Sequence, residues 1–347
     1  MEWLNTPARA PNTATTEAAR LRQSQLTKPP GALGELEAVA IRLAGLQGRE
    51  QPAVDKVHIS VFAADHGVAE EGVSAFPQAV TAQMVHNFLN GGAAINVLAQ
   101  TLGATLEIID VGIKTQLTHP KLISQRAGNG TANSTLSPAM SDTQLNLALQ
   151  AGADAAERAY ATRAELFIGG EMGIANTTAA TAIYCTLLKV AIPEATGAGT
   201  GLDQAGIVHK VSVIQRIIKQ HCHHLDKPLE VLRHLGGFEI AALTGAYVRA
   251  AQLGLPILID GFISTAAALI ATKLQPGVAH WLFLSHASAE PGHVFAMAEL
   301  KQRPLLDLNL RLGEGSGAAI AVPLLRLACA LHNQMATFDE AAVAGKL

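Results

Sequence analysis

Cysteine, aromatic residues and charge are all scarce in this chain. Three cysteines in 347 residues, without CxxC spacing, exclude a disulfide framework and predict reduced thiols in the cytoplasm. Charged residues make up only 15% and the formal net charge is −3, so the chain lacks the basic face of a nucleic-acid binder. The 49% of hydrophobic residues excludes disorder, and the 4% of aromatic residues favours close packing of small side chains.

The chain also lacks a long uninterrupted apolar run. Its N-terminal residues show no apolar stretch of the signal-peptide type. The most apolar region, 240–271, is interrupted by Arg249 and Asp260, and the Gly-Leu-Pro sequence breaks it midway. This pattern predicts a buried helix followed by a buried strand, with no membrane span.

Short apolar runs alternate with long helical patterns through the middle of the chain. Six runs resemble strands buried on both faces; they lie at 57–65, 105–113, 164–170, 255–262, 279–286 and 305–315. This alternation predicts an α/β fold with a Rossmann-like, mostly parallel sheet covered by helices. Residues 13–25 and 34–47 read as amphipathic helices, and the stretch after Pro323 also looks helical. We expect both termini to form a small helical domain (1–45 and 326–347) beside a large α/β domain (46–325).

Polar groups beside glycines follow each of these six runs. They are Asp65-His66, Asp110, Glu171, Asp260, Ser285-His286 and Glu314. Because ligands bind outside the carboxyl ends of parallel strands, six such groups indicate one shared pocket. A single Asp after a strand is usually a turn residue.

Two glycine-rich segments are typical of phosphate binding. The segment GGEMGIANTT places Asn176, Thr177 or Thr178 where each can cap a helix, and a helix N-terminus suits a phosphate, although an ordinary capped turn looks the same. The segment TGAGTG lacks the Lys-Ser/Thr of a Walker loop, but Lys210 downstream can supply a point charge.

The sharpest motif is LRLGEGSG. Glu314 stands between two glycines, after a strand and before a helix that Ser316 can cap. Such a turn exposes a carboxylate at the sheet edge, as a general base requires, but a Glu at a helix start also simply favours the helix dipole. The adjacent histidines in HCHH (221–224) cannot all face one ion, so we expect no metal site there.

The segment at 70–96 joins a turn to an amphipathic helix. Phe76 and Pro77 offer a flat apolar surface, and Ser74 and Gln83 offer polar groups. This combination suits a small aromatic base, although the start of a core-packed helix would look the same.

Taken in order, the motifs resemble one known family along nearly the whole chain, from Lys28 to about Pro323. They are AADHGV (63–68), GVSAFPQAVTAQM (72–84), GGEMGIANTT (169–178), TGAGTGLD (196–203), PLEVLRHLGGFEIAALTG (228–245), LIDGFISTAAAL (258–269), SAEPGH (288–293) and LRLGEGSGAA (310–319). This set resembles the nicotinate-nucleotide:dimethylbenzimidazole phosphoribosyltransferases, which make the lower-ligand nucleotide of cobalamin. Ala175 stands where the family usually has Gly, Ala198 where Arg is common, and Phe76 where Tyr is frequent.

The resemblance implies a cytoplasmic homodimer that needs no cofactor or metal. It implies transfer of the phosphoribosyl group of nicotinate mononucleotide to 5,6-dimethylbenzimidazole, with inversion at C1′, giving α-ribazole 5′-phosphate and nicotinate. Glu314 matches the catalytic base. The implied substrate-binding residues are Ser74, Phe76, Gln83, Met84, Glu171, Gly173, Ile174, Asn176, Thr177, Gly197, Gly199, Gly201, Lys210, Asp260, Ser288, Leu312 and Gly313.

Two other functions stay open at this point. The same transferase can prefer another acceptor, such as adenine or a phenol, and a non-catalytic homologue can bind the nucleotide alone. A Rossmann oxidoreductase is excluded, because GxGxxG followed by an acidic residue about twenty positions on is missing.

Overall fold

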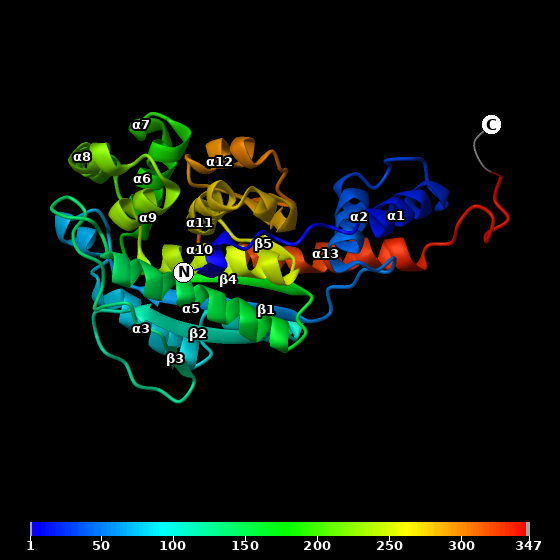
Figure 1. Cartoon of the computed structure of the whole chain (residues 1–347), viewed down its shortest axis with the longest axis horizontal. Coiled ribbons are helices and arrows are strands. Elements are labelled where there is room, and N and C mark those ends of the chain that lie inside the picture. Colours follow the sequence, from blue (N-terminus) through cyan, green and yellow to red (C-terminus); the bar gives the residue numbers. More distant parts are fainter. Residues whose placement is uncertain (1, 345–347) are drawn as a thin grey trace.

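Six parallel strands form the central sheet of the computed structural model, which describes residues 2–344 (Figure 1). Their spatial order is β3-β2-β1-β4-β5-β6. Every residue of β1 is buried, as expected for a strand with both faces covered. The predicted α/β class is confirmed. The strands are β1 (Val57–Ala64), β2 (Thr105–Gly112), β3 (Leu122–Ser124), β4 (Leu166–Met172), β5 (Ile257–Ile259) and β6 (Leu282–Leu284).

Helices cover this sheet, and two of them pack very closely against each other. Helix α10 (Phe238–Leu253) packs on β1 and β4 and lies against α5 (Asp142–Ala161). A Cβ added at Gly152 would come within 1.7 Å of the Ala242 carbonyl oxygen, so the α5 and α10 backbones meet where there is no side chain. The small residues abundant in the sequence make this close packing possible. The other helices around the sheet are α3 (Ala79–Leu89), α4 (Ala94–Leu102), α6 (Asn176–Leu188), α7 (Ile192–Ala195), α8 (Gln204–His221), α9 (Pro228–Leu235), α11 (Phe262–Leu274) and α12 (His293–Leu300).

A separate pair of parallel strands, β7 (His286–Ser288) and β8 (Leu306–Leu310), lies outside the main sheet. A strand does form within 305–315, but it lies outside the main sheet, so the prediction that it is buried on both faces was wrong. The central residues of β8 are exposed, and Leu308 retains 55% of its accessible surface. Apolar spacing alone does not distinguish a buried strand from one at the surface.

Helices from the two ends of the chain pack together. Helices α1 (Thr13–Gln25) and α2 (Glu35–Gln47) lie beside the far end of α13 (Ser316–Gln334), away from the sheet (Figure 1). Both N-terminal helices were predicted correctly. Helix α13 begins at Ser316, where the motif around Glu314 predicted a helix start, and it continues through Pro323, so the helical stretch expected after Pro323 is the second half of this helix. The proposed domain boundary at 325/326 falls within this continuous helix, and the division into domains stays a prediction.

No helix among residues 2–344 is both long and apolar enough to cross a bilayer.

Helix α6 begins in an unusual conformation. Its N-cap residue, Ala175, has φ of 77°, in the left-handed region, and no side chain caps the helix. The predicted caps were wrong: Asn176 donates to Glu171, Thr177 accepts from Lys210, and the Thr178 hydroxyl has no partner among residues 2–344. A left-handed alanine costs roughly 1–2 kcal/mol, which explains why glycine would suit this position.

We predict that Ala175→Gly raises the free energy of unfolding by about 1 kcal/mol, because glycine removes the left-handed strain. Urea unfolding midpoints measure this change. Ala179→Gly, inside the same helix, is the matched control and should lower stability by about 1 kcal/mol. Equal destabilisation by both substitutions would contradict strain at Ala175.

Candidate active site

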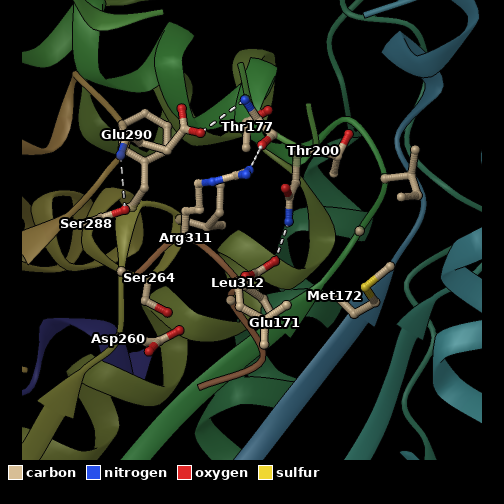
Figure 2. Close-up of a pocket in the computed structure, with 18 of the residues that line it drawn as sticks. Glu171, Met172, Thr177, Thr200, Asp260, Ser264, Ser288, Glu290, Arg311 and Leu312 are labelled. Carbon is tan, nitrogen blue, oxygen red and sulfur yellow. Dashed lines mark hydrogen bonds between the residues drawn. The ribbon is translucent and has the colours of Figure 1, made fainter. Parts of the chain in front are cut away.

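A cavity of about 300 Å³ opens at the carboxyl ends of β4 and β5 (Figure 2). Most of its walls come from the ends of four strands: 171–177 at and after the end of β4, 260–264 after β5, 286–290 in and after β7, and 311–313 after β8. Parallel strands therefore deliver these residues to one edge, as the sequence predicted. Phe76, Gly199 and Thr200 complete the lining.

Most of the predicted site residues meet at this cavity. Those that line it are Phe76, Glu171, Gly173, Ile174, Asn176, Thr177, Gly199, Asp260, Ser288, Leu312 and Gly313. Lys210 lies behind this lining and donates to Thr177 Oγ1 at 2.6 Å, and Ser74 Oγ lies 3.3 Å from Thr200 Oγ1. The other five predicted residues lie outside the lining. Gln83 and Met84 belong to α3, and Gly197, Gly201 and Glu314 belong to other segments.

Two of the strand-end acids do not belong to the cavity. Asp110 accepts the backbone N–H groups of Gly112 and Ile113 and pairs with Arg126 at 2.6 Å, so it stabilises its own turn. Asp65 accepts the N–H of Lys114 at 2.7 Å. The prediction that all six groups share one pocket was therefore wrong for these two, and Glu314 lies next to the lining at Gly313, not in it.

Glu314 occupies the middle of a left-handed turn. The φ angles of Gly313, Glu314 and Gly315 are 89°, 65° and 84°. The residue is 5% exposed, and its Oε2 has no hydrogen-bond partner within residues 2–344. Burial raises the pKa of the carboxyl and the charge of Asp260 raises it further, while the N–H of Ile95 lowers it. A carboxylate with a raised pKa and a free oxygen is suited to accept a proton.

A second carboxyl, Glu171, lies at the end of β4. Burial and the nearby charges of Glu239 and Asp260 raise its pKa to about 8, against a hydrogen bond from Asn176 that lowers it. Glu171 is therefore mostly neutral at pH 7. In this neutral form Glu171 can lie beside Glu239 and Asp260, where a third negative charge would raise the free energy of the folded state.

The opposite wall of the cavity carries Arg311 and the buried carboxyl of Glu290, with Lys210 behind the lining. Burial lowers the pKa of Lys210 to about 8, and Glu290 opposes this shift, so the ammonium is mostly charged at pH 7. Figure 2 shows Arg311 reaching across the cavity towards Thr177 and Glu290. Its Nη1 lies 3.4 Å from the Gly199 carbonyl oxygen, and no carboxylate of the described chain lies within salt-bridge distance of it.

Arg311 and Glu290 were not predicted from the sequence. Glu290 is buried, and its Oε1 accepts the Gly199 N–H at 3.0 Å. Arg311 lies three positions before Glu314 in the LRLGEG motif, and this position was the one feature of the sequence that could have indicated a role in the site. For Glu290 the only signal was its place in the SAEPGH motif.

The predicted helix cap at Ser316 was wrong. Ser316 Oγ donates back to the Gly313 carbonyl at 2.7 Å, and Gly315 is the N-cap residue of α13. Instead, both oxygens of Asp260 accept backbone N–H groups at the start of this helix, from Gly315 at 3.1 Å and from Ala318 at 2.9 Å.

The consecutive histidines have other partners. His221 lies 2.8 Å from the Ser134 carbonyl oxygen and 2.8 Å from the His234 ring. Among residues 2–344, no group of three or more His, Cys, Asp or Glu residues is arranged to hold a metal ion.

Comparisons with known proteins agree on one family. A family model described as phosphoribosyltransferase matches residues 8–343. The nicotinate-nucleotide–dimethylbenzimidazole phosphoribosyltransferase of Pseudomonas fluorescens is 57% identical over 345 residues, which cover 99% of this chain and 98% of that protein. The enzyme of the same name from Pseudomonas syringae pv. syringae is 57% identical over 344 residues, with the same coverage.

A solved structure shows the same fold. The crystal structure of the Thermus thermophilus enzyme of this name superposes with a TM-score of 0.91 at 46% identity, covering 96% of this chain and 100% of that one. The chain therefore belongs to the nicotinate-nucleotide–dimethylbenzimidazole phosphoribosyltransferase family.

Proposed function

We propose that this phosphoribosyltransferase moves the phosphoribosyl group of nicotinate mononucleotide to 5,6-dimethylbenzimidazole, with Glu314 as general base. The products are α-ribazole 5′-phosphate and nicotinate, with inversion at C1′. The observation that carries the proposal is the buried Glu314 carboxylate, which keeps one oxygen without a partner among residues 2–344 beside a cavity lined by Arg311.

The chemistry requires one base and no acid at the leaving group. The bare ring nitrogen of the acceptor forms a bond to C1′ while the bond from C1′ to the pyridinium nitrogen breaks. The bonding electrons return to the pyridine ring, which leaves without needing a proton. Positive charge then grows on the acceptor, and Glu314 relieves it by taking the proton from the other ring nitrogen.

The 5′-phosphate matches the two cations on this side of the cavity. Arg311 offers a guanidinium with no carboxylate partner in the described chain, and Lys210 adds a buried charge behind Thr177. The N-terminus of α6 adds its dipole, because no side chain caps it. Fixing the phosphate here holds C1′ towards the carboxyl side, and such positioning can contribute more than the proton transfer itself.

The acceptor ring matches the apolar part of the lining. Phe76 lines the cavity and is 50% exposed, and Met172 and Ile174 line it beside Glu171. A flat, largely apolar ring packs on such a surface while its N–H donates to a carboxylate. Ser74, Gln83 and Met84 remain proposed contacts of this ring.

We also infer a homodimer in the cytoplasm. Exposed apolar side chains on the packed helices α4 and α13, Val97 at 59% and Leu327 at 54%, support an interface between copies. The three cysteines are free, which supports a reducing compartment.

We predict that Glu314→Gln lowers kcat by about 10²–10⁴-fold, because an amide cannot accept the ring proton. Both KM values should stay within about threefold, since the substrates still bind. Nicotinate release in the presence of dimethylbenzimidazole measures both quantities. Glu17→Gln, on the exposed face of α1, is the matched control. Unchanged kcat in Glu314→Gln would refute the assignment of the base.

Arg311→Gln should raise the KM for nicotinate mononucleotide by about 10- to 100-fold, because a charge-assisted hydrogen bond to phosphate contributes about 1.5–3 kcal/mol. We expect a smaller change in kcat. Steady-state kinetics with Arg303→Gln as control provides the test, since Arg303 is exposed and lies outside the cavity. If both variants give the same KM, Arg311 does not bind the phosphate.

A further inference from the structure

We propose that Asp260 is a positioning residue, which fixes the backbone of the Glu314 turn and thereby aims the base. This inference rests on the proposed role of Glu314 and assigns Asp260 a task other than the substrate binding expected from the family resemblance.

Asp260 divides its two oxygens between two amides of the same turn. Oδ2 accepts the Gly315 N–H at 3.1 Å, and Oδ1 accepts the Ala318 N–H at 2.9 Å. The residue is 2% exposed and follows β5 directly. Helix α13 has no cap from its own sequence, so this carboxylate supplies both the acceptors and the negative charge that a helix N-terminus favours.

The Gly315 N–H is the decisive contact. It belongs to the peptide bond that joins Glu314 to Gly315, so its direction depends on the ψ angle of Glu314. On the other side, the same peptide bond packs on β4, because a Cβ added at Gly170 would lie 2.3 Å from the Glu314 carbonyl oxygen. The peptide is therefore enclosed between Asp260 and the Gly170 backbone.

The turn needs such support. A left-handed glutamate costs roughly 1–2 kcal/mol relative to an ordinary conformation, and such residues persist only where the surroundings determine them. The flanking glycines permit the turn without fixing it. The two hydrogen bonds that Asp260 accepts from Gly315 and Ala318 help to select this conformation.

The charge of Asp260 gives a second, independent readout, which is the pH dependence of kcat. Asp260 and Glu171 face Glu314 from the ends of β5 and β4, and His286 and Tyr247 face Asp260 from β7 and α10. The negative charge of Asp260 raises the pKa of Glu314. Removing that charge should lower this pKa, and the acidic limb of the kcat profile should move to lower pH.

The test is a double-mutant cycle between Asp260→Asn and Glu314→Gln. Asparagine keeps one acceptor, loses the charge and places an NH₂ group against an N–H donor. We expect Asp260→Asn to lower kcat by about 10- to 100-fold, as a misplaced catalytic group does, with little change in the KM for nicotinate mononucleotide. In the Glu314→Gln background the same change should cost almost nothing more, because its effect passes through Glu314.

A matched control keeps the cycle interpretable. Arg311→Gln should raise the KM in both backgrounds, since it acts on the nucleotide and not on the base. Circular dichroism and thermal melting confirm that each variant is folded. If Asp260→Asn does not fold, Asp260→Ser, which keeps one oxygen acceptor, replaces it in the same cycle.

Three results would overturn the proposal. A raised KM with unchanged kcat would make Asp260 a substrate contact. An equal kcat loss in both backgrounds would make its role independent of Glu314, and an unmoved acidic limb would contradict the charge coupling. Full activity of Glu314→Gln alone would instead refute the base, and so separates failure of the proposed function from failure of this inference.

Discussion

The peptide bond between Glu314 and Gly315 is the point on which the candidate site depends. It lies between the Gly170 backbone of β4 and the carboxylate of Asp260 after β5. Two neighbouring strands of the sheet thus fix the first turn of α13, and that turn carries the candidate base. A change in either strand would move Glu314 without touching it.

Ionisable groups lie on both sides of the cavity. Glu171, Asp260 and Glu314 gather at the ends of β4, β5 and β8, and Arg311 lies opposite them, with Lys210 behind Thr177 and Glu290 beside Lys210. Burial would make three adjacent charged carboxyls costly, and the raised pKa of Glu171 relieves this by leaving it neutral. An anionic phosphate and a ring that develops positive charge fit the two sides of such a cavity.

Local signals in the sequence predicted local features well. The helices at 13–25 and 34–47, and the strands that lead to Glu171 and Asp260, follow from apolar spacing and breaks at glycine and proline. The motif around Glu314 also predicted the turn, because glycines flank the carboxylate between a strand and a helix. Phosphate binding beside Lys210 and the glycine-rich segments remains a prediction, although the structure brings Lys210 to Thr177 and Gly197.

Features that depend on distant partners were not predictable. Asp110 and Asp260 look alike as acids after strands, but only the fold brings Arg126 to the first and α13 to the second. The caps expected at Asn176 and Ser316 failed for a local reason, since the nearby Glu171 carboxylate and Gly313 carbonyl bind these side chains instead. Leu308 sits in an apolar run, yet β8 lies at the surface because it pairs only with β7.

The most direct test of the proposed function is nicotinate release from nicotinate mononucleotide by the purified protein, with and without 5,6-dimethylbenzimidazole. We expect release only when the base is present, with α-ribazole 5′-phosphate formed in equal amount. Release without the base, or a β-configured product, would contradict direct displacement at C1′. No release with the base would show that the chain has kept the fold of its family without this reaction.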